Sequence, residues 1–176
     1  MRTMAPPVRK LVLTTHITSS VGWLGAVLAF LALAVIGLTS QDDQTVRAVY
    51  LVMEPAAWYA LIPLAVASLL TGLVQSVGTT WGLFRHYWVI FKLLINLGAI
   101  VVLLMYTETL GYLAGLAAAP DTDLGLLRNP SVLIHTVLAL MLLLAATVLA
   151  VYKPRGRTRY ALRTRPTASR TAAPQR

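Results

Sequence analysis

Four long apolar stretches dominate this sequence and restrict what it can fold into. They run over residues 11–38, 51–77, 89–116 and 132–151. A helix needs about 20 apolar residues to cross the roughly 30 Å hydrocarbon core of a bilayer, and each stretch is long enough. The chain of 176 residues is 57% hydrophobic and only 12% charged, a balance that one small water-soluble domain cannot bury. We therefore predict an all-α fold, an integral membrane four-helix bundle.

Turn and cap residues divide the chain around these stretches. Residues 1–10 form a basic lead, and residues 153–176 form a basic Arg-, Thr-, Ala- and Pro-rich tail that is predicted to be disordered. Pro55 and Pro63 are expected to kink the second helix, which Ser40 or Asp42 can cap. The expected helices span 11–38, 44–77, 88–116 and 131–152.

The net charge of +9 is distributed unevenly, and this distribution predicts the topology. If the helices alternate in direction, twelve Lys and Arg side chains fall on the side of the termini, whereas only Arg47 and Arg128 fall on the other. The positive-inside rule then places both termini in the cytoplasm. The basic tail is expected to meet anionic lipid, and no nucleic-acid partner is predicted.

Lys92 is the one cation inside an apolar stretch. A charge at membrane depth costs roughly 2.5–3.5 kcal/mol on insertion scales, so it normally faces the bundle interior and has a partner. His16 on the first helix lies at a similar depth and is the predicted partner. Helical periodicity adds Trp23, Gln75 and Asn96 as neighbours of a shared site. A simpler alternative is that Lys92 extends to the interface while the other polar residues only hold helices together.

A second polar group is expected nearer the opposite surface. Glu54, Glu108 and His135 could form a proton relay or a metal site there, although headgroup water could equally solvate all three. The chain contains no Cys, and it has no phosphate loop, GxSxG or HExxH motif.

Two short motifs carry a family resemblance. The first helix contains HITSSVGWLG from His16 to Gly25, and YWVIFK from Tyr87 to Lys92 opens the third. Over residues 8–152 the chain resembles an actinobacterial integral-membrane family of unknown function. More distantly, it is similar to copper-resistance D-type proteins and to oxygen-independent protoporphyrinogen oxidases. These resemblances imply a protein of the bacterial plasma membrane. The oxidase resemblance implies that His16 serves b-type haem and that Lys92 acts with it. The Arg and second His that follow the Trp in those oxidases are missing, since residues 26–33 are apolar.

Three functions remain open on the sequence alone. The first is a haem-binding or redox-linked bundle with His16 as a ligand and Lys92 beside a propionate. The second is a non-enzymatic accessory or scaffold protein, with a membrane-protein partner or a second copy of the chain. The third is a small metal- or proton-transport subunit that uses Glu54, Glu108 and His135.

Overall fold

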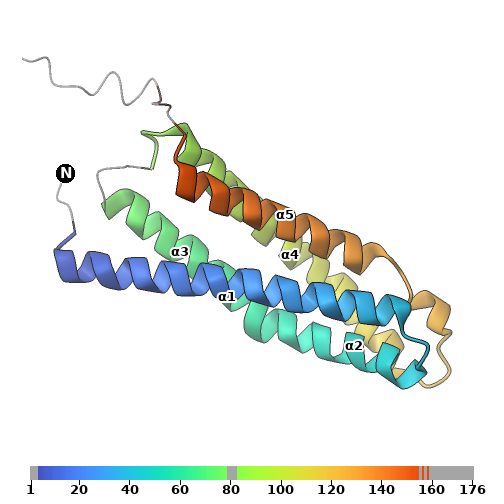
Figure 1. Cartoon of the computed structure of the whole chain (residues 1–176). Coiled ribbons are helices and arrows are strands. Elements are labelled where there is room, and N and C mark those ends of the chain that lie inside the picture. Colours follow the sequence, from blue (N-terminus) through green and yellow to red (C-terminus); the bar gives the residue numbers. More distant parts are fainter. Residues whose placement is uncertain (1–3, 79–82, 155, 157, 159–176) are drawn as a thin grey trace, which may run out of the picture.

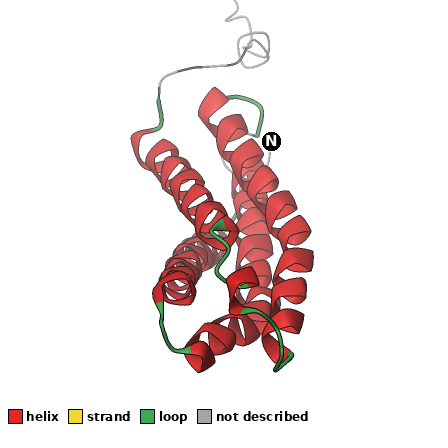
Figure 2. Cartoon of the chain, turned by 90° about the vertical axis from the view of Figure 1, so that its right-hand side faces the viewer, coloured by secondary structure: helices red, strands yellow, loops and turns green. Residues whose placement is uncertain are grey.

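The computed structural model describes residues 4–78, 83–154, 156 and 158, and these residues form helices joined by short loops (Figures 1 and 2). No strand occurs within this described part of the chain. In chain order the elements are α1 (Pro6–Thr39), α2 (Asp43–Ala56), the π-helix η1 (Ala57–Leu61), α3 (Ile62–Gly78), α4 (Tyr87–Ala118), the 3₁₀-helix η2 (Leu124–Leu126) and α5 (Ser131–Tyr152).

Four helical segments are long and apolar enough to span a membrane, which confirms the predicted all-α four-helix bundle. They are Pro6–Thr39, Asp43–Gly78, Tyr87–Ala118 and Leu124–Tyr152, so α2, η1 and α3 count as one continuous span. Large apolar side chains cover the outside of the bundle; Leu11, Met105 and Val151 are each more than 65% exposed. A surface of this kind is stable in lipid and would aggregate in water.

The start of α1 and the end of α5 lie at the same end of the bundle, as four spans require (Figure 1). We call this the terminal end, and we call the opposite end, with the α1–α2 and α4–α5 connections, the loop end. The cytoplasmic location of the terminal end stays a prediction. Reporter fusions in the 119–130 loop and at the C-terminus can test it.

The helix limits agree with the predicted ones except at the first helix and at the prolines. α1 begins at Pro6, so Pro6–Lys10 of the expected basic lead is helical. Proline suits the first helical turn, because that turn needs no backbone N–H donor. In the second span, a kink was expected at Pro55 and Pro63. The structure has a π-helical turn, Ala57–Leu61, between these two prolines.

Two arginines hold the loop end together. The Arg47 guanidinium on α2 donates to the carbonyl oxygens of four residues at and beyond the end of α4, at 2.6–3.1 Å; the acceptors are Ala117, Ala119, Pro120 and Thr122. Arg128 donates to the Ser40 carbonyl at 3.0 Å. Carbonyl groups at a helix C-terminus lack intrahelical partners and attract cations. The two basic residues of this end are therefore structural ties between the connections.

The N-terminus of α2 is capped by Asp42, one of the two residues predicted for that role. Its carboxylate accepts from the backbone N–H of Thr45 at 3.0 Å and from the Thr45 hydroxyl at 2.5 Å. These hydrogen bonds, led by the one from the hydroxyl, hold the pKa of the Asp42 carboxyl below its ordinary value.

The start of the C-terminal tail contacts the bundle, although disorder is predicted for the whole of residues 153–176. Thr158 is buried; its N–H donates to the Arg85 carbonyl at 3.0 Å, and its hydroxyl donates to the Phe84 carbonyl at 2.5 Å. The connection between α3 and α4 exposes these carbonyls, which is why a polar tail residue can bind there. Residues 159–176, where tail disorder was also predicted, lie outside the described residues.

Candidate functional site

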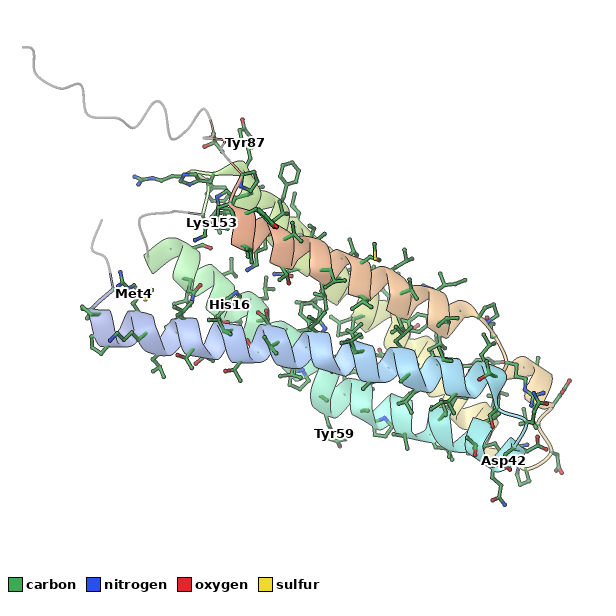
Figure 3. All side chains as sticks on the ribbon, in the orientation of Figure 1. Met4, His16, Asp42, Tyr59, Tyr87 and Lys153 are labelled. Carbon is green, nitrogen blue, oxygen red and sulfur yellow. The ribbon has the colours of Figure 1, made fainter. Side chains whose placement is uncertain are left out.

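A histidine and a lysine from different helices meet inside the half of the bundle nearer the terminal end. His16 on α1 is buried, and its Nε2 lies 3.2 Å from Nζ of Lys92 on α4. Lys92 is partly buried. Figure 3 shows His16 on the side of α1 that faces α3. The ammonium of Lys92 is thus bonded inside the bundle to the partner that the sequence predicted.

The other ring nitrogen of His16 is anchored to α3. Its Nδ1 lies 3.1 Å from the Ser68 carbonyl oxygen and 3.1 Å from Oγ1 of Thr71. The Thr71 hydroxyl donates its own proton to the Ala67 carbonyl at 2.6 Å. Both neighbours of Nδ1 therefore act as acceptors, so Nδ1 carries a hydrogen. In the neutral imidazole this leaves Nε2 as the acceptor, and Lys92 donates to it.

Small residues allow α1 and α3 to approach closely around the imidazole. Ser20 and Ser68 share a hydrogen bond of 2.7 Å between their hydroxyl oxygens. A Cβ atom placed on Gly72 would lie only 3.1 Å from Cε1 of His16. Small side chains are typical where membrane helices pack tightly. The ring is consequently held at Nδ1, at Nε2 and against the Gly72 backbone.

Lys92 has no acidic partner in the described part of the chain, where no salt bridge to it is formed. The carboxylates available there lie in other places: Glu108 is exposed, and Asp42 and Asp43 are exposed at the loop end. The imidazole of His16 is therefore the hydrogen-bond acceptor that the fold offers to this cation.

The remaining predicted members of the site do not bond to the pair. Trp23 is buried, but it lies seven residues after His16, which places it roughly 10 Å further along α1. No hydrogen bond joins Gln75 or the buried Asn96 to His16 or to Lys92. The Ser68 carbonyl, the Thr71 hydroxyl and the Gly72 backbone make the contacts with His16 that were expected of Gln75 and Asn96.

Ser68 and Thr71 lie on the same helix as Gln75, seven and four residues before it, but only Gln75 was predicted to belong to the site. The hydrogen bond that anchors the imidazole goes to the Ser68 main-chain oxygen. The pattern of side chains along the helix does not show which main-chain oxygen will be used. The usable signal was Gly72, because a glycine one position after Thr71 marks a place where another helix can come close.

The second predicted group does not form a cluster of three metal ligands in the described part of the chain. Within the described residues no three His, Asp or Glu side chains gather closely enough to hold a metal ion, and these residues include Glu54, Glu108 and His135. Glu108 is exposed, whereas Glu54 and His135 are partly buried. His135 instead stacks on Tyr106, with ring centroids 4.2 Å apart and an interplanar angle of 25°.

The packing around His16 bears on the haem hypothesis. Nε2, the nitrogen that would bind iron, is already engaged by Lys92 at 3.2 Å, and Gly72 lies against the ring. A porphyrin would have to displace Lys92 and separate α1 from its neighbours. Haem binding through Nε2 would therefore require the contact with Lys92 to open.

The fold and the site together define an all-α, four-helix bundle of membrane-spanning dimensions with a buried His–Lys pair. Comparison of the chain with protein-family models, with curated proteins and with solved structures found no match. The resemblance to the integral-membrane families thus depends on the two motifs around His16 and Lys92.

Proposed function

We propose that this protein is a membrane proton-transfer protein in which His16 and Lys92 share, take up and release one proton. The observation that carries the proposal is the 3.2 Å contact between Lys92 Nζ and His16 Nε2. An ionisable residue within a membrane bundle normally marks such a function, and here its partner is also titratable.

The anchor at Nδ1 suits both protonation states of the imidazole. When Lys92 holds the proton, its ammonium donates to the lone pair of Nε2. When the proton moves to Nε2, the imidazolium donates to the neutral amine of Lys92, while its Nδ1–H still donates to the Ser68 carbonyl. Every polar hydrogen on the ring keeps an acceptor in both states. The proton can therefore cross between the helices without rotation of the ring.

The charge balance also supports a proton function. A buried ion pair would fix Lys92 in one charge state, but no described carboxylate pairs with it. The polar groups around the pair are neutral: the Ser68 carbonyl and the Thr71 hydroxyl. Such groups stabilise the pair without requiring a permanent charge on either member.

The test is nitrogen NMR of histidine-labelled protein in lipid nanodiscs, recorded as a function of pH. The His16 nitrogens should titrate, and Lys92→Met should shift that titration because the charge next to Nε2 is removed. Lys10→Met is the matched control: Lys10 is exposed near the start of α1, so this variant should leave the His16 signals unchanged. A His16 ring that does not titrate between about pH 5 and pH 10 would disprove proton exchange at the pair.

Stability measurements separate this proposal from the scaffold alternative. If Lys92 only extends to the interface, Lys92→Met should be neutral or stabilising, and the His16 titration should be the same in both proteins. A shared proton predicts instead that the His16 titration changes even where the variant folds as well as the natural protein.

Haem binding is the second candidate function, and one observation favours it. Metal-ligating histidines almost always donate their second ring N–H to a carbonyl or carboxylate, as His16 does to Ser68. Binding would require Lys92 to leave Nε2. A Soret band in the purified protein that disappears in His16→Ala would support this candidate, and its absence after expression with added haem would reject it.

A further inference from the structure

A cavity of about 190 Å³ lies between α1, α4 and α5, in the half of the bundle towards the loop end. Trp23, Val27 and Phe30 of α1 form one wall. Most of the lining is apolar, and its polar members sit mainly on α4 and α5: Tyr106, His135 and Thr136. Neither His16 nor Lys92 lines it, so the cavity is separate from the proposed proton site.

The cavity borders on lipid along the seam between α4 and α5. Val102 of α4 and Leu138 and Leu142 of α5 line it, yet their side chains are 51%, 56% and 42% exposed. A residue that both lines a cavity and faces outward lies at its opening. A molecule dissolved in the membrane can therefore enter between these two helices.

His135, at the polar end of the cavity, has an unused hydrogen-bond acceptor in the described part of the chain. His135 Nδ1 lies 2.8 Å from the Ser131 carbonyl of its own helix, so Nδ1 carries the hydrogen. The neutral ring then has a lone pair on Nε2, and no hydrogen bond to Nε2 occurs within the described residues. The Tyr106 hydroxyl is already paired with the Ser131 hydroxyl at 3.1 Å.

The size of the cavity selects the class of ligand. An apolar cavity of about 150 Å³ can hold a benzene molecule, whereas sites for drug-sized ligands begin near 300 Å³. A cavity of about 190 Å³ therefore holds one substituted six-membered ring. A long hydrocarbon chain on that ring would remain in the lipid outside Val102 and Leu138.

We infer that this cavity binds the ring of a lipid-soluble phenol or hydroquinone, whose hydroxyl donates to Nε2 of His135. The apolar walls accept the ring, and the opening between α4 and α5 accepts its alkyl chain. A quinone has only carbonyl acceptors at these positions, and two acceptors repel each other. The site should accordingly prefer the reduced, hydroxyl-bearing form.

Binding to the natural full-length protein in nanodiscs tests this inference directly. The probes are an alkyl hydroquinone under anaerobic conditions, the corresponding quinone, and the dimethyl ether of the hydroquinone. Titration calorimetry against empty nanodiscs should show that the hydroquinone binds about tenfold more tightly than the ether, the effect of one hydrogen bond. Equal affinities for the hydroquinone and the ether, or tighter binding of the quinone, would overturn the inference.

Two variants locate the site. His135→Phe keeps an aromatic ring beside Tyr106 but removes the acceptor, so it should weaken hydroquinone binding about tenfold and leave ether binding unchanged. Ala139→Leu fills the cavity and should abolish binding of both. The matched control is Ala145→Leu, on the exposed side of α5 and away from the cavity lining, which should bind normally. If neither His135→Phe nor Ala139→Leu changes the hydroquinone affinity, the hydroquinone only partitions into lipid. That result would refute the site.

Discussion

Gly72→Ala tests the packing that holds the imidazole of His16 in place. The added methyl carbon would lie 3.1 Å from Cε1 of His16, which is several tenths of an ångström closer than ordinary van der Waals contact. The ring cannot turn away freely, because Nδ1 is bonded to Ser68 and Nε2 to Lys92, at 3.1 and 3.2 Å. Movement that relieves the clash therefore stretches at least one of these hydrogen bonds.

The size of the effect follows from two opposing contributions. Replacing a helical glycine by alanine stabilises a helix by about 0.8–1 kcal/mol. Overpacking against a constrained neighbour costs about 1–3 kcal/mol, and the rigid position of His16 favours the upper part of that range. The expected net result is a destabilisation of about 1–2 kcal/mol. The sign would reverse only if the imidazole could move at little cost.

Gly98→Ala on α4 is the matched control, because an added Cβ there meets no other atom within 4 Å. We expect this variant to be neutral or slightly stabilising. Unfolding in mixed micelles of increasing SDS content measures both stabilities, and nitrogen NMR of His16 reports whether the ring has moved. If Gly72→Ala matches Gly98→Ala in stability and leaves the His16 signals in place, the close packing inferred around the imidazole is refuted.

The loop end provides three further predictions. Arg47→Met removes four hydrogen bonds to carbonyl oxygens and should lower the free energy of unfolding by about 2 kcal/mol; no loss in an SDS titration would contradict the role of Arg47 as a tie. Tyr50→Phe leaves the buried Leu127 carbonyl without the hydroxyl that donates to it and should cost about 1–3 kcal/mol, measured in the same way. The pKa of Asp42 is lowered by folding, so its contribution to stability is present above the ordinary aspartate pKa and is lost as the pH falls through the lower folded value. Asp42→Asn should therefore show a smaller acid-induced loss of stability than the natural protein, and identical acid profiles would contradict this.

The spans could be predicted from the sequence because bilayer thickness imposes a length and a composition on each helix. The pairing of His16 with Lys92 was predictable for a related reason. Charged and polar groups at membrane depth require hydrogen-bond partners, and few groups at this depth other than His16 could accept a hydrogen bond from Lys92. Depth can be counted along a helix from its end, so residues on different helices can be compared before their contacts are known.

The contacts of main-chain atoms could not be predicted in this way. The Ser68 carbonyl accepts from His16, and the Phe84 and Arg85 carbonyls accept from Thr158. Every residue has a carbonyl, so side-chain patterns do not show which one is used. The tail illustrates the consequence: its composition predicts disorder, but Thr158 meets unpaired carbonyls in the α3–α4 connection and binds them.

Trp23 shows most clearly why a helical face is insufficient to define a site. His16, Trp23 and Val27 lie along one face of α1, and all are buried. Towards the terminal end this face meets α3 and Lys92, whereas at Trp23 and Val27 it borders the cavity shared with α4 and α5. The face is continuous, but the helices opposite it change over roughly 10 Å, which is the axial distance from His16 to Trp23. Periodicity identifies residues that point in one direction, and only the arrangement of the other helices separates them into a buried His–Lys pair and the lining of an apolar cavity.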